Sequence, residues 1–185
     1  MRAVHQHLDD IVRPALRNYI DAERTLDRAN HSKDAAAVDA ARGNVMRTAR
    51  TATTELHHLA DVVLVDMAPR FADLSALRHA LRAACVFDRG TVPGPDTDLL
   101  HDSADAFKHF VLTRPTATIT GAAAIVSISN GWGEMRYGEQ KYGGEEQVTI
   151  TRNDGNKYAL LWILQNSYDA WMPVLGLPQT QRWQY

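Results

Sequence analysis

The chain has 185 residues, 45% of them hydrophobic, with 20 basic against 22 acidic side chains. This length can bury a full core in one domain or two small ones. The charges are also balanced on both sides of Pro115. Basic and acidic residues number 15 against 16 up to Pro115 and 5 against 6 after it. Nucleic-acid binding driven by bulk charge is thereby disfavoured, since neutralising phosphates requires a net basic surface.

Cysteine content and the N-terminal residues bear on location. The single cysteine, Cys85, excludes an internal disulfide and lies in an apolar helical run, which favours a small buried side chain in a reducing compartment. His5, His7, Asp9 and Asp10 stand where a signal peptide would need an apolar stretch, and no run approaches the ~18 apolar residues of a membrane span. We therefore expect a cytoplasmic, soluble protein without a membrane partner.

The first two predicted elements are long amphipathic helices. Residues 4–29 place apolar side chains on one helical face, and Pro14 either starts the main helix or kinks it. Residues 34–67 carry a narrow apolar stripe with coiled-coil-like spacing. With residues 31–33 as the turn, the two helices are predicted to pack as an antiparallel hairpin.

Two shorter helices are predicted next. Pro69 closes the second helix and opens a third, at residues 70–88. A loop rich in glycine and proline follows, after which Asp96 or Asp98 can cap a fourth helix at residues 99–113. These four segments are enough to build a helical bundle.

After Pro115 the hydrophobic period changes to two, which is typical of strands. Asp154-Gly155 is a hairpin turn signal that joins the last two strands. A C-terminal helix is predicted at residues 161–175, ended by Pro173 and Gly176, and it is expected to pack the sheet against the bundle. The predicted strands are residues 116–120, 124–130, 147–152 and 157–160.

The predicted fold is therefore α+β: an N-terminal antiparallel bundle of about four helices, a small antiparallel β-sheet and a C-terminal helix. Residues 1–115 form the bundle. Residues 116–185 form the β-hairpin sheet with its closing helix, and we expect one compact unit with the bundle rather than two independent domains.

Three pentapeptides, WGEMR, YGEQK and YGGEE, follow one another at residues 132–146, between two predicted strands. A period of five fits neither a helix nor a strand, so a glycine-rich loop that displays aromatic faces is predicted. Tyr and Trp supply large contact area at low entropy cost. The leading hypothesis is a non-enzymatic interaction or assembly protein whose partner is another protein or a second copy of itself. Its predicted contact residues are Trp132, Arg136, Tyr137, Lys141 and Tyr142.

Other interpretations of this loop stay open. The aromatic rings could stack on sugar rings or fold back on the bundle, while stacking on bases is disfavoured because four glutamates outnumber the two basic residues.

The fourth predicted helix carries a candidate metal site. His101, Asp105 and His109 recur at i, i+4 spacing on one helical face, and these residue types bind zinc or iron. A solvated polar surface is the alternative interpretation. Glu55-x-x-His58 matches half of a di-iron carboxylate pattern, but the second half is absent. A metal-binding helical-bundle enzyme is thus a second alternative function, and the sequence assigns no cofactor.

The run from Asp102 to Pro115 resembles a segment of uncharacterised bacterial helical proteins that are loosely HEPN-like, over about one helix. The resemblance implies a helical bundle, often dimeric, whose active members cleave RNA with an arginine placed shortly before a histidine on one helix. Here no arginine precedes His109 at that distance, and Arg114 follows it. The alternative function is therefore a metal-independent ribonuclease, for which alone RNA is a partner. Its catalytic residues would be Lys108, His109 and Arg114, with Asp105.

Common enzyme signatures are absent from the sequence. It has no Ser-His-Asp order, P-loop, Rossmann glycine fingerprint or Cys-x-x-Cys motif. Nucleotide-dependent and acyl-transfer chemistry therefore lack support.

Overall fold

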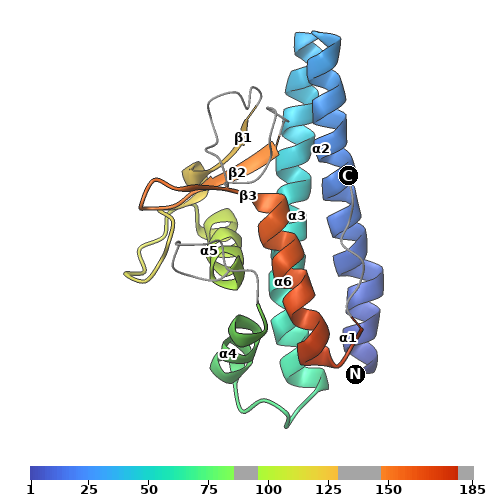
Figure 1. The fold of residues 1–185 in the computed structure, drawn as a ribbon, viewed down its shortest axis with the longest axis vertical. Helices are drawn as coiled ribbons and strands as arrows, with labels where there is room; N and C mark the ends of the chain where they lie inside the picture. The colour runs from blue at the N-terminus through green and yellow to red at the C-terminus, as the bar shows by residue number, and fades with distance from the viewer. Residues whose placement is uncertain (86–95, 129–146, 179–185) are drawn as a thin grey trace.

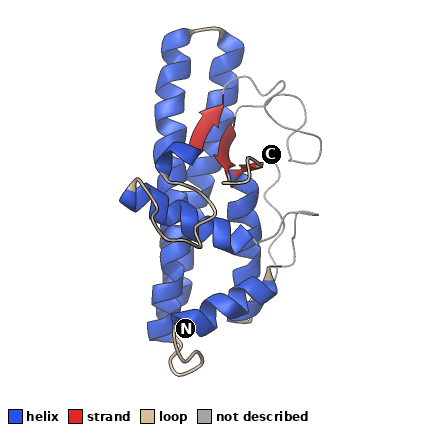
Figure 2. Cartoon of the chain, turned by 90° about the vertical axis from the view of Figure 1, so that its left-hand side faces the viewer, coloured by secondary structure: helices blue, strands red, loops and turns tan. Residues whose placement is uncertain are grey.

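The computed structural model describes residues 1–85, 96–128 and 147–178. Within these residues the chain is α+β, with long helices and a three-stranded antiparallel sheet at one side (Figure 1, Figure 2). None of the described helices combines the length and the apolar character that crossing a membrane requires.

The first helical rod runs without interruption through three segments. These are α1 (Arg2–His7), the π-helical η1 (Leu8–Val12) and α2 (Arg13–Ser32). Pro14, which has no backbone N–H to donate, lies in the first turn of α2 immediately after the wider π-helical turn. The segment α2 therefore begins beside Pro14, as one of the two predicted outcomes has it, but the helical rod itself already begins at Arg2.

The predicted antiparallel hairpin of long helices is confirmed (Figure 1). Lys33 adopts a left-handed conformation with φ 59° and ends α2. Asp34 then caps α3 (Ala35–Asp66), because its Oδ1 accepts hydrogen bonds from the backbone N–H groups of Ala36 and Ala37 at 3.0 and 3.3 Å. The buried stripe of α3 contains Val45, Ala49, Ala52, Leu56, Leu59 and Val63.

The third and fourth helices differ from the prediction at their ends. Helix α4 (Leu74–Ala84) begins later than residue 70, because Asp73 Oδ1 accepts from the backbone N–H of Ala76 at 2.8 Å and so defines the N-terminus. Helix α5 (Asp96–His109) already includes Asp96, and it ends before residue 113 because Phe110 has φ 62°.

The sheet contains β1 (Ile125–Ile128), β2 (Gln147–Thr151) and β3 (Lys157–Ala159), in that spatial order. Both pairings are antiparallel, and the hairpin predicted from Asp154-Gly155 is confirmed by the pairing of Thr151 with Lys157.

The strand predicted at residues 116–120 is wrong. The backbone N–H of Thr118 donates to a carboxylate oxygen of Asp102 at 2.6 Å rather than to a neighbouring strand. The segment folds into turns and bends, and only an isolated bridge between Val111 and Gly121 flanks it.

Helix α6 (Leu160–Leu175) follows β3 directly and ends at Gly176, which has φ 72°. It contacts α3, α4 and α5 as well as β2 and β3. Nearly all of its side chains are buried, as expected of a helix that is apolar on most faces. As predicted, the closing helix packs against both the sheet and the other helices.

Candidate functional site

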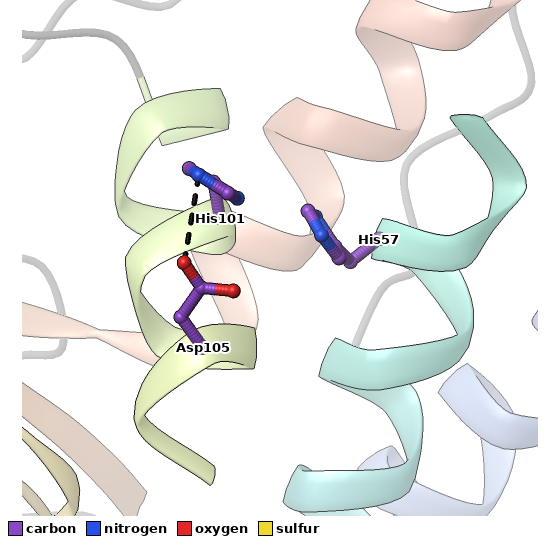
Figure 3. A group of neighbouring side chains, drawn as sticks. All are labelled: His57, His101 and Asp105. Carbon is purple, nitrogen blue, oxygen red and sulfur yellow. Dashed lines mark ion pairs between the residues drawn. The ribbon is translucent and has the colours of Figure 1, made fainter. Parts of the chain in front are cut away.

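Three side chains from two helices converge between α3 and α5 (Figure 3). His57 approaches from α3, and His101 and Asp105 project from α5. One metal-ligating atom of each residue lies within 4.8 Å of those of the other two. All three side chains are partly buried. We call this group the His57 cluster.

His101 and Asp105 form the half of the cluster that the sequence placed together. Their i, i+4 spacing brings Nε2 of His101 to 3.6 Å from Oδ2 of Asp105. The structure does not bring the predicted third member, His109, into this group, and its side chain is exposed. Eight helical residues span about 12 Å along the axis, so histidines at positions 101 and 109 cannot share one ion.

His57 is the member that the sequence analysis missed. The hydrophobic stripe predicted on α3 passes through Ala52, Leu56 and Leu59, and His57 lies beside it. A signal was present in the smaller residues, because Thr53 and Ala60 are both buried and stand four residues before and three after His57. That spacing indicates that a second helix packs on the face of α3 that carries His57. Helix α5 makes this contact.

Arg114, predicted as a catalytic residue, reaches the cluster from beyond the end of α5. Its Nη1 lies 2.6 Å from Nε2 of His101, and its Nη2 lies 3.5 Å from Oδ2 of Asp105. The same Nη2 donates to Oδ1 of Asp102, whose side chain is only 5% exposed. The backbone N–H and the hydroxyl of Thr118 both donate to Oδ2 of Asp102 at 2.6 Å. Asp102 therefore holds both the guanidinium and the following segment in place.

The contact with Arg114 determines the tautomer of His101. A guanidinium group only donates hydrogen bonds, so Nε2 of His101 must accept, and a neutral ring then carries its proton on Nδ1. Burial, assisted by the positive charge of Arg78, lowers the pKa of His101 below its usual value.

The second imidazole is neutral at pH 7 as well. Burial lowers the pKa of His57 to about 4, and the neighbouring His101 and Arg78 act in the same direction. The two rings stack with centroids 4.9 Å apart and an interplanar angle of 25°. Neutral imidazole is the form that binds metal ions and accepts protons.

A solvent-facing groove of about 390 Å³ opens beside the cluster. His57 and Asp105 line it together with Lys108, a further predicted catalytic residue. Its three cations outnumber its two carboxylates, which makes the groove weakly positive at neutral pH. The lining consists of Arg50, Thr54, His57, His58, Asp61, Arg78, Ala104, Asp105, Phe107 and Lys108.

The predicted contact residues of the aromatic loop, Trp132, Arg136, Tyr137, Lys141 and Tyr142, lie outside the described residues. In comparisons with known proteins, the chain matches no family model, no curated protein and no solved structure.

Proposed function

We propose that the protein binds one divalent transition-metal ion at His57, His101 and Asp105 and uses it as the catalytic centre of an enzyme. The observation that carries this proposal is the convergence of three ligating atoms within 4.8 Å. Around an ion with bonds of about 2.0–2.2 Å, ligand atoms stand roughly 3–3.5 Å apart. Small side-chain rotations would therefore be enough to close the site.

The number and placement of the ligands favour catalysis over a structural role. Structural zinc sites are closed by four protein ligands, whereas catalytic sites have three and leave a position for water or substrate. A set of two histidines and one carboxylate serves zinc hydrolases and non-haem iron enzymes alike. His57 and Asp105 both line the groove, so substrate could approach the ion from there. The metal would supply Lewis acidity or an activated water molecule.

Arg114 is the main competitor of a metal ion at this site. An ion bound to Nε2 of His101 would replace the hydrogen bond from Nη1, while the bond between Arg114 and Asp102 could remain. The guanidinium would then stand beside the metal, where it could stabilise negative charge that develops on the substrate.

The test is metal titration of the full chain, purified without a histidine tag and stripped with a chelator. We expect one Zn²⁺, Fe²⁺ or Mn²⁺ per chain by calorimetry and elemental analysis. Binding should weaken at least tenfold in His57→Ala, His101→Ala and Asp105→Ala but stay unchanged in His109→Ala. The proposal would be overturned if the wild type bound none of the three metals. Full retention of metal binding in His57→Ala would also overturn it.

One observation favours a second candidate, metal-independent RNA cleavage. Arg114 stands 2.6 Å from His101, so the arginine–histidine pairing of a HEPN-like site could use His101 in place of His109. A neutral imidazole can act as general base, and a guanidinium can stabilise the charge of a phosphorane. Lys108 in the groove adds a further cation.

This second candidate is separated from the first by chelation. Under single-turnover conditions in EDTA, the wild type should cleave RNA, His101→Ala should not, and His109→Ala should behave as wild type. Cleavage that appears only after metal is added back would exclude the metal-independent route.

The assembly function and the cytoplasmic location remain predictions. The aromatic loop that carries the assembly hypothesis is compatible with either enzyme, because its predicted contacts and the His57 cluster involve different residues.

A further inference from the structure

A second hollow, separate from the groove, lies between α3, α4, α5 and α6. Its volume is about 60 Å³, and His57 and Arg78 line both it and the groove. One buried water needs roughly 10–15 Å³ by the same measure, so the cavity can hold a molecule the size of a few waters. Its apolar walls are formed by Leu56, Ala60, Leu81, Leu100 and Trp171.

Three buried polar atoms belong to residues that line this cavity and have no hydrogen-bond partner within the described parts of the chain. They are Oγ1 of Thr97, Nδ1 of His101 and Oγ of Ser167. Ser167 is the most enclosed, with 1% of its surface exposed. Native proteins pair the great majority of buried polar atoms, so three such atoms around one cavity indicate that a polar molecule binds there.

The available groups are able to donate hydrogen bonds. The proton of His101 is on Nδ1, because Nε2 accepts from Arg114. The hydroxyl groups of Thr97 and Ser167 can donate too. Such a set matches a ligand whose polar end consists of acceptor oxygens.

The charges at the cavity point to an anion. Arg78 has no ion-pair partner among the described residues, although it lines the cavity. The carboxylate of Asp98 also lines it, but Oδ2 of Asp98 is paired with Arg82 at 3.2 Å. The positive charge of Arg78 is thus the one available to a ligand.

We propose that this cavity binds a short-chain carboxylate, from acetate to butyrate in size. Its oxygens accept from His101, Ser167 and Arg78, and its hydrocarbon part packs against the apolar walls. Binding in the cavity needs no metal, so this inference goes beyond the proposed metal centre and does not rest on it.

The experiment is an NMR titration of the isotope-labelled full chain with butyrate, in EDTA. We expect saturable shifts of amide signals from α5 and α6, and much weaker binding of butyramide, which lacks the negative charge. Arg78→Gln should weaken butyrate binding about tenfold. Ser167→Ala should weaken it several-fold without loss of thermal stability, because the hydroxyl that is removed has no described partner.

The matched control is Arg47→Gln, which removes an equal charge from an exposed position on α3 that lines neither hollow. Its butyrate affinity should equal that of the wild type. No saturable binding to the wild type would show that the cavity takes only water and would overturn the inference. Equal weakening in Arg78→Gln and Arg47→Gln would also overturn it, since attraction by net charge would then suffice.

The two proposals fail separately. Butyrate binding in EDTA by a protein that binds no metal would refute the metal centre alone. Stoichiometric metal binding by a protein that ignores butyrate, with and without the metal, would refute the cavity ligand alone.

Discussion

Nη1 of Arg114 lies 2.6 Å from Nε2 of His101, and the same guanidinium is paired with the buried carboxylate of Asp102. A permanent cation is thus held against the nitrogen that a metal ion would use. The metal affinity of the His57 cluster is therefore expected to depend strongly on the charge at position 114.

Replacing Arg114 by glutamine should strengthen metal binding. The positive charge 3.5 Å from Asp105 disappears, and Nε2 of His101 loses its competing donor. We expect Zn²⁺ affinity, measured by calorimetry, to rise several-fold. The unfolding free energy should fall by about 1–3 kcal/mol, because Asp102 loses a charged partner. Weaker Zn²⁺ binding in this variant would show instead that Arg114 orients the ligands.

The stability of the chelated protein should fall on acidification through His57. Its pKa is about 4 in the folded chain and about 6.5 when unfolded, so between these values the unfolded state binds more protons. His57 therefore has no effect on stability above pH 6.5, and its protonation costs up to about 3 kcal/mol as pH falls from 6.5 to 4.

Urea denaturation in EDTA at pH 7.5 and pH 4.5 measures this loss. The comparison is with His57→Gln, in which every carboxylate still titrates. We expect a smaller fall in unfolding free energy for the variant, and an equal fall would contradict the assignment.

Gly121 should tolerate no side chain. Its φ is 153°, and an added Cβ would stand 2.2 Å from the carbonyl oxygen of Phe110. Gly121→Ala should lower the unfolding free energy by about 2–4 kcal/mol, because backbone strain adds to the clash.

Gly43→Ala is the matched control, since Gly43 lies inside α3 and an added Cβ would meet only Nη1 of Arg47 at 3.8 Å. This variant should be more stable than wild type by about 0.5–1 kcal/mol. If the two variants shift the urea midpoint alike, the close approach at Gly121 does not exist.

The assembly hypothesis predicts that the aromatic side chains determine the oligomeric state, and hence the mass of the particle in solution. Light scattering of the wild type should give an oligomer, and the combined variant Trp132→Ala/Tyr137→Ala/Tyr142→Ala should give a folded monomer, because the large rings that make the contact are gone. Equal masses, with unchanged binding of partners, would defeat the hypothesis.

Sequence patterns predicted the elements that depend on neighbouring residues. The hairpin turn at Asp154-Gly155 and the helix end at Gly176 follow from local backbone chemistry, and both are confirmed. Period counting predicted the hairpin of α2 and α3 for the same reason.

Local patterns failed where a distant side chain decides the outcome. The alternating residues 116–120 satisfy the strand pattern. The backbone N–H and the hydroxyl of Thr118, however, donate to the carboxylate of Asp102 and not to a neighbouring strand. Equal spacing along α5 grouped His109 with His101, although the helical rise separates them by about 12 Å.

The sequence by itself determined the α+β class, the two long helices and the presence of His101, Asp105 and Arg114 on one short stretch, because helix and strand periods are properties of neighbouring residues. The tertiary structure decided that His57 completes the cluster and that Arg78 and Ser167 line a shared cavity. Together with His101 on α5, these residues come from four helices, α3 to α6. Their meeting depends on how those helices pack, which no local pattern encodes.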